Sequence, residues 1–145
     1  MLIRTINVKD LTKLIKDKAL IQGKNYQVVD VRDQDYEGGH IVGSVNLPAH
    51  TIPGTADDLV KKFHGIQKLI FHCLLCQVRG PKAARIYGDA VDRQLAKEEN
   101  PESSPLAKQE VYFLEGGFMS WLHEHKESPG LIVDYDPEFW KDEQD

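Results

Sequence analysis

Cysteine is scarce in this chain: only Cys73 and Cys76 occur among 145 residues, three positions apart. Two cysteines this close together do not form the framework of a disulfide-stabilised secreted domain. Long apolar runs are also missing, and a chain without about 18 consecutive apolar residues has no membrane-spanning helix. We therefore expect a protein of the reducing cytoplasm, with the nucleus as an alternative location, whose thiols serve chemistry rather than structure.

An excess of positive charge is missing as well. Residues 1–125 carry 16 acidic and 16 basic side chains, whereas residues 126–145 carry seven acidic and two basic ones, which accounts for the net charge of −5. This balance argues against nucleic-acid binding. We expect one catalytic domain over residues 1–125 and an acidic C-terminal tail over residues 126–145. The tail contains three aromatic residues, Tyr135, Phe139 and Trp140, which can pack back on the domain. Because chain termini are often poorly ordered, we expect a docked or frayed terminus rather than a recognition tail.

Strand-like and helix-like segments alternate along the chain. Strands are predicted over residues 26–31, 44–46, 68–72 and 110–114, and helices over residues 8–18, 56–63, 81–97 and 117–123. Asn7 and Thr55 are the expected N-caps of the first two helices. Strands that alternate with helices predict an α/β fold with a central parallel sheet flanked by helices.

The most informative stretch runs from Cys73 to Arg79, with five residues between them. It links a predicted buried strand to a helix that starts near Gly80-Pro81. Backbone N–H groups in such a loop and at a helix N-terminus converge on one point and favour negative charge there. We expect them to lower the pKa of the Cys73 thiol and make it a nucleophile. Arg79 can bind a tetrahedral oxyanion bidentately. We call the backbone N–H groups that would surround the anion the oxyanion cradle. They are predicted to be those of Leu74, Leu75, Cys76, Gln77, Val78 and Arg79.

Three stretches together resemble a known family. They are Val28-Val29-Asp30-Val31-Arg32 with the following Tyr36-Glu37-Gly38-Gly39-His40-Ile41, the run from His72 to Pro81, and the run from Val111 to Trp121. As a set they resemble single-domain rhodanese-like proteins, in particular the branch of cell-cycle dual-specificity phosphatases and small eukaryotic arsenate reductases. The resemblance spans about residues 2–125. It implies a rhodanese-like three-layer domain.

The resemblance leaves several functions open. The first is a cysteine phosphatase of the tyrosine or dual-specificity type, with a phosphocysteine intermediate on Cys73. The alternative is an arsenate reductase that uses the same cysteine, with glutathione as co-substrate and glutaredoxin as a partner. Sulfurtransferases of the family have a loop one residue shorter, so a thiosulfate sulfurtransferase is less favoured, as is a non-catalytic rhodanese module. We expect a phosphorylated protein or a small oxyanion as substrate, and no metal, cofactor, membrane or nucleic-acid partner.

Two positions of the loop depart from the related phosphatases. Those phosphatases carry acidic residues where this chain has Leu74 and Val78, so a proton donor for the leaving group is missing from the loop. Asp33, Glu37 and Glu115 are the candidates from neighbouring loops.

Cys76 is a further departure, because the family usually has serine there. One hypothesis is a reversible Cys73–Cys76 disulfide that protects the nucleophile from over-oxidation. The other is that Cys76 replaces serine without a redox role. A zinc site is disfavoured, since no second pair of ligands accompanies the two cysteines.

Other matching residues are interpreted as structural. Asp30 and Arg32 are expected to hold the sheet edge to the loop that follows, and His40 to have a similar role. His72 is expected to hydrogen-bond to neighbouring backbone rather than to donate a proton. Gly116-Gly117 is expected to let its backbone pass close to the Cys73 loop.

Overall fold

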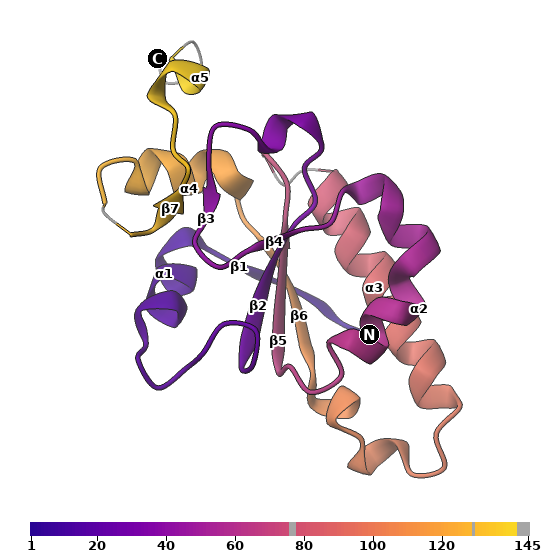
Figure 1. Ribbon diagram of the computed structural model, residues 1–145. Coiled ribbons are helices and arrows are strands. Elements are labelled where there is room, and N and C mark those ends of the chain that lie inside the picture. The colour runs from indigo at the N-terminus through magenta and orange to yellow at the C-terminus, as the bar shows by residue number, and fades with distance from the viewer. Residues whose placement is uncertain (76–77, 129, 142–145) are drawn as a thin grey trace.

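The computed structural model describes residues 1–75, 78–128 and 130–141 of the chain. Its centre is a five-stranded parallel sheet with the strand order β1-β6-β5-β2-β4. The strands are β1 (Ile3–Ile6), β2 (Tyr26–Asp30), β4 (Val45–Asn46), β5 (Lys68–His72) and β6 (Glu110–Leu114). Helices α1 (Val8–Lys16) and α4 (Gly117–His125) cover one face, and α2 (Ile52–Lys62) and α3 (Arg79–Ala96) cover the other (Figure 1). The predicted three-layer α/β fold is confirmed.

The two faces of the sheet have separate apolar cores, which explains the unbroken apolar run Leu69-Ile70-Phe71 in the central strand. In the central strand β5, Leu69 and Phe71 belong to the core under α2 and α3, whereas Ile70 belongs to the core under α1 and α4. Successive side chains of a strand point to opposite faces, so a sheet covered on both sides needs an unbroken apolar run. This burial fixes β5 in the middle of the domain and places the residue after it, Cys73, at the centre of the sheet edge.

Two helix starts differ from the sequence prediction. Helix α2 begins at Ile52, directly after a 3-10 turn over Ala49–Thr51, and not at residue 56. Thr55 is therefore not its N-cap; its hydroxyl donates a hydrogen bond to the Thr51 carbonyl one turn back. Helix α3 begins at Arg79, two residues before the predicted start at Pro81. Short polar segments before a proline carry little periodicity, so the sequence pattern locates such starts poorly.

The segment after α4 folds back onto the domain. Strand β7 (Ile132–Val133) pairs antiparallel with β3 (His40–Ile41), and the short helix α5 (Pro137–Trp140) follows (Figure 1). The Trp140 indole is 2 % exposed. It packs 5.6 Å from the Phe118 ring and donates a hydrogen bond of 2.8 Å to the Gly38 carbonyl. Residues 131–140 thus hold the loop that follows β2.

The described residues contain no helix that is both long and apolar enough to cross a bilayer.

The docking of α5 predicts a large energetic difference between two adjacent aromatic residues. Trp140→Ala removes a buried indole and its hydrogen bond, so we expect a loss of about 3 kcal/mol in the free energy of unfolding. Phe139→Ala, at a side chain that is 42 % exposed, is the matched control, with an expected loss of about 1 kcal/mol. Urea denaturation measures both. Equal losses would contradict the docking of this helix through Trp140.

Candidate active site

The candidate site lies where the parallel strands end. Parallel strands present their carboxyl ends at one edge of the sheet, so the loops after β2, β5 and β6 gather there (Figure 1). These three loops carry the three stretches singled out in the sequence. The loop after β5 connects Cys73 to α3, the loop after β2 carries the acidic residues 33–37, and Gly116 joins β6 to α4.

Cys73 lies at the N-terminus of α3. Its side chain is buried, and the backbone N–H of Gly80 points to Sγ at an N···S distance of 3.3 Å. Gly80 is in the first turn of an 18-residue helix, where N–H groups lack helical partners and the helix dipole favours an anion. The sequence predicted that amides of the helix N-terminus take part, but the named cradle residues, 74–79, did not include Gly80.

Helix α4 holds the first half of the Cys73 loop. The Phe118 N–H donates to the Cys73 carbonyl and the Met119 N–H to the Leu74 carbonyl, both at 2.9 Å. The peptide unit is planar and trans, so the N–H groups of Leu74 and Leu75 point away from α4. The Cys73 and Leu74 carbonyls thus hold the loop to α4, and the N–H groups of Leu74 and Leu75 face the side on which an anion would bind.

Gly117 makes this close approach of α4 possible. It has a φ of +59°, and a Cβ atom there would lie 2.5 Å from the Leu74 carbonyl oxygen and 2.6 Å from that of Cys73. Only glycine fits such a contact without moving the loop. The expectation that Gly116-Gly117 pass close to the Cys73 loop agrees with this geometry.

His72 is fully buried at the end of β5. Its Nδ1 lies 3.0 Å from the Cys73 carbonyl oxygen, which can only accept, so Nδ1 carries the proton. Nε2 lies 3.7 Å from the Asp30 carboxylate. Nε2 has no hydrogen-bond partner among the described residues, so the ring's bond is to neighbouring backbone, in agreement with the structural role expected for it.

Arg79, the first residue of α3, forms a bidentate ion pair with Asp35. Nη1 and Nη2 donate to the two carboxylate oxygens at 3.1 and 2.6 Å. Burial raises the pKa of the Asp35 carboxyl, but the hydrogen bonds and charge of Arg79 outweigh burial and leave this pKa below its ordinary value. The hydrogen bonds that Arg79 donates to Asp35 likewise raise the pKa of Arg79, against burial, and the charges of Asp35 and Cys73 add to the increase. Asp35 is therefore an ionised partner that orients the guanidinium.

Asp35 owes its position to a buried ion pair below it. Asp30 and Arg32 are both fully buried, with Nη2 of Arg32 2.7 Å from the Asp30 carboxylate. The same guanidinium donates to the backbone carbonyls of Asp35 and Gly39, each at 2.9 Å. The predicted structural role of Asp30 and Arg32 agrees with these contacts. His40, also expected to be structural, stacks on the Tyr36 ring with centroids 5.0 Å apart.

Sequence reasoning did not single out Asp35. Three acids alternate at 33, 35 and 37, and nothing in the sequence distinguishes the one that faces Arg79. Of the three candidate proton donors, Asp33 hydrogen-bonds to His50 at 3.2 Å, and the side chains of Glu37 and Glu115 are exposed. These observations do not single out one of the three as proton donor, so that role stays a prediction.

Two residues of the predicted cradle, Cys76 and Gln77, lie outside the described residues. The Cys73–Cys76 disulfide and the contribution of these two amides stay predictions. Among the described residues, no group of three His, Cys, Asp or Glu side chains is placed to hold a metal ion.

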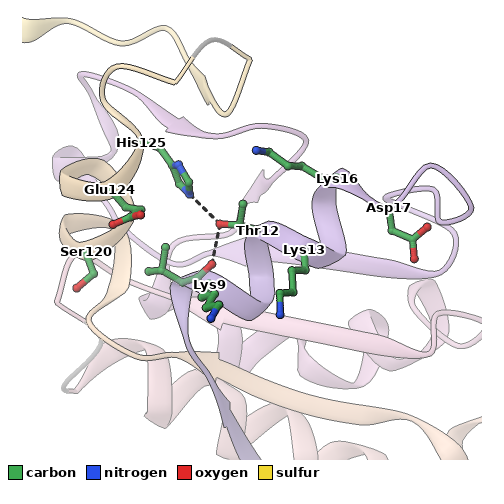
Figure 2. A pocket seen from close by; sticks show the side chains of 9 residues that line it. Lys9, Thr12, Lys13, Lys16, Asp17, Ser120, Glu124 and His125 are labelled. Atoms are coloured by element: carbon green, nitrogen blue, oxygen red, sulfur yellow. Dashed lines mark hydrogen bonds between the residues drawn. The ribbon is translucent and has the colours of Figure 1, made fainter.

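Away from the Cys73 loop, a groove of about 850 Å³ lies between α1 and α4 (Figure 2). None of the residues that line it belongs to the Cys73 loop. In its wall, the Thr12 hydroxyl donates to the Val8 carbonyl and so accepts from Nε2 of His125, both at 2.7 Å. Burial lowers the pKa of His125, in keeping with a neutral ring. Thr12 and His125 therefore join α1 to α4 by a hydrogen bond, and we assign them a structural role.

Comparisons of the sequence and of the structure with known proteins indicate the same family. The sequence model of the rhodanese-like domain family matches residues 13–124. The dual specificity phosphatase ibp1 of Schizosaccharomyces pombe is 38 % identical over 117 residues, which cover 75 % of this chain and 83 % of that protein. Arsenate reductase 2.2 of Oryza sativa subsp. japonica is 32 % identical over 104 residues, covering 70 % and 73 %. The structure of Ygr203w, described as a yeast protein tyrosine phosphatase of the rhodanese family, is 25 % identical and superimposes with a TM-score of 0.76 over 95 % of this chain and 96 % of that one.

The Gly117 contact predicts opposite effects of the same substitution at two glycines. Gly117→Ala forces a positive φ on alanine and a clash with two carbonyl oxygens, so we expect a loss of more than about 2 kcal/mol in the free energy of unfolding. Gly54→Ala, at a helical position where an added Cβ meets nothing within 4 Å, should instead stabilise by about 0.5 kcal/mol. Urea denaturation checks both signs. A neutral Gly117→Ala would mean that α4 does not hold the loop this closely.

Proposed function

Because the chain belongs to the rhodanese-like domain family, we propose that it is a cysteine-dependent phosphatase of the protein tyrosine or dual-specificity type. The observation that carries this proposal is the Gly80 N–H on the Cys73 sulfur, with Arg79 one residue before it at the head of α3. A thiolate, a helix N-terminus and a guanidinium in this order suit a tetrahedral dianion. The name of the S. pombe relative, a dual specificity phosphatase, gives independent support.

The reaction takes place in two displacements. In the first, the Cys73 thiolate attacks phosphorus, an S–P bond forms, and the bond to the leaving oxygen breaks with its electron pair on that oxygen. In the second, water attacks the phosphocysteine, inorganic phosphate leaves, and the thiolate is restored. Loop amides and Arg79 stabilise the three equatorial oxygens, where negative charge accumulates in both steps.

Asp35 leaves Arg79 enough donors for this task. A guanidinium has five N–H groups, and the Asp35 carboxylate accepts one from each terminal nitrogen. Three N–H groups remain, including that of Nε, for two bonds to a phosphate. The ion pair therefore aims the arginine without occupying all of it.

Protonation of the leaving group is the weak point of this site. Asp35 is ionised by Arg79 and cannot donate a proton, and the loop has Leu74 and Val78 where related phosphatases have acids. Without a strong general acid, esters with a stable leaving anion react best. The site therefore favours aryl esters, such as phosphotyrosine, over alkyl esters.

Arsenate reduction is the second candidate. The missing loop acids favour it, because arsenate carries a hydroxyl group whose proton can leave with the departing oxygen as water, whereas an alkyl ester needs a proton from the enzyme. Relatives named arsenate reductases also support it. In this reaction Cys73 forms an S–As bond, and a glutathione thiol attacks the sulfur. Arsenic leaves as arsenite with the electron pair, Cys73 becomes a mixed disulfide, and a second thiol, from glutathione or glutaredoxin, restores it.

Hydrolysis of p-nitrophenyl phosphate under reducing conditions separates the two candidates. We expect turnover by the wild type and a loss of at least about a thousandfold in Cys73→Ser, because serine is a much weaker nucleophile in this setting. If the wild type is no faster than Cys73→Ser, the phosphatase proposal is wrong. Arsenate-dependent oxidation of glutathione, absent in Cys73→Ser, would then support the reductase.

The ion pair with Asp35 predicts a second effect on turnover. Asp35→Asn keeps the size of the side chain but removes the charge that aims Arg79, so we expect kcat/KM for the same ester to fall about 10- to 100-fold. Asp57→Asn is the matched control, because Asp57 of α2 pairs at 3.0 Å with exposed Arg93, which lies on α3 like Arg79 but far from Cys73. An equal effect of both substitutions would contradict the positioning role.

The same variant has a pH signature. A carboxyl whose pKa is lowered by folding stabilises the protein above its unfolded pKa of about 4, and this contribution is lost as the pH falls through the lower folded pKa. The difference in unfolding free energy between wild type and Asp35→Asn should therefore shrink on acidification below about pH 4. A constant difference would indicate a packing effect.

A further inference from the structure

A second, smaller pocket opens directly beside Arg79. It has a volume of about 240 Å³ and lies between the start of α2 and the first turns of α3. Its walls are mostly apolar and include Pro53, Val78, Ala83 and Ile86. This volume is below the roughly 300–1,000 Å³ of pockets for whole small molecules, and is of a size for one side chain.

The pocket is continuous with the oxyanion cradle. Arg79, Ala83 and Ile86 are spaced by four and three residues, so they share one face of α3 that runs from the cradle into the pocket. Val78, the residue before the helix, also lines it. A substrate whose phosphate lies on Arg79 must therefore extend its neighbouring atoms over this pocket or away from it.

The exposed side chains around the cradle, Leu75 and Val78, are unusually apolar for a site that binds only an inorganic anion. Val78 is 69 % exposed and Leu75 is 50 % exposed, and both belong to the catalytic loop. Lys82 lines the pocket one turn after Arg79 and is itself exposed, which adds positive charge next to apolar walls. Arsenate or phosphate alone makes no use of such a surface, whereas a peptide chain supplies apolar side chains beside its phosphate.

We propose that this pocket receives an apolar side chain that flanks the phosphorylated residue of a protein substrate. The inference rests on the proposed phosphatase function and names its substrate class, a phosphorylated peptide segment rather than a free oxyanion. The phosphate binds to the Cys73 loop and Arg79, and the neighbouring leucine-like side chain lies between Pro53 and Ile86. Selectivity then comes from burial of that side chain in addition to phosphate binding.

The test compares two phosphotyrosine peptides that differ only next to the phosphotyrosine, with leucine on both sides in one and serine on both sides in the other. We expect the wild type to prefer the leucine peptide by about tenfold or more in kcat/KM, the size of effect that burial of one aliphatic side chain produces. In Ile86→Glu, which puts a charge into the pocket wall, the preference should fall to about twofold or less. Turnover of p-nitrophenyl phosphate should change by less than about twofold.

Gln94→Glu is the matched control, because it adds the same charge to α3 two turns farther from the site and should leave the preference intact. Thermal unfolding of both variants verifies that they are folded. Equal rates for the two peptides, with p-nitrophenyl phosphate still hydrolysed, would overturn this inference alone. A parallel loss of p-nitrophenyl phosphate turnover in Ile86→Glu would also overturn it, because the pocket would then hold the leaving-group ring. No hydrolysis of any ester by the wild type would instead reject the phosphatase proposal itself.

Discussion

The buried ion pair between Asp30 and Arg32 is the interaction on which the candidate site depends. Both side chains are withdrawn from water at the end of β2, which costs several kcal/mol per charge unless every donor and acceptor is used. Here the guanidinium donates to the Asp30 carboxylate and to two backbone carbonyls of the following loop. The loop is therefore folded around a charge that cannot be left unpaired, and the carboxylate of Asp35 reaches Arg79 because of it.

Three layers of support can be followed outward from the sheet. The strand ends supply Asp30 and His72, the buried Arg32 shapes the loop above them, and helix α4 holds the carbonyls of the Cys73 loop from the other side. Trp140 closes the arrangement by its hydrogen bond to Gly38 in the same loop. Reactive groups at the edge of the sheet are thus positioned by rigid elements rather than by the loop alone.

The sequence was sufficient for those features that depend on local pattern. Apolar strands, the Cys73–Arg79 spacing and the Gly116-Gly117 pair each have a short-range signature, and they predicted the parallel sheet and the close passage of α4. Pairings between distant segments had no such signature. Tertiary packing decides which of the three alternating acids faces Arg79 and where Trp140 packs on Phe118. The early start of α3 goes with the hydrogen bond from the Lys82 N–H to the Val78 carbonyl.

The hydrogen bonds from α4 have a consequence for how this domain changes over evolutionary time. Since Phe118 and Met119 hold the loop through the backbone carbonyls of Cys73 and Leu74, this support does not depend on which side chains stand at the exposed positions 75 and 78. Those two positions can be exchanged without loss of either hydrogen bond. Substitutions at exposed Leu75 and Val78 can thereby alter what the loop accepts as a substrate, while its two backbone anchors to α4 stay in place.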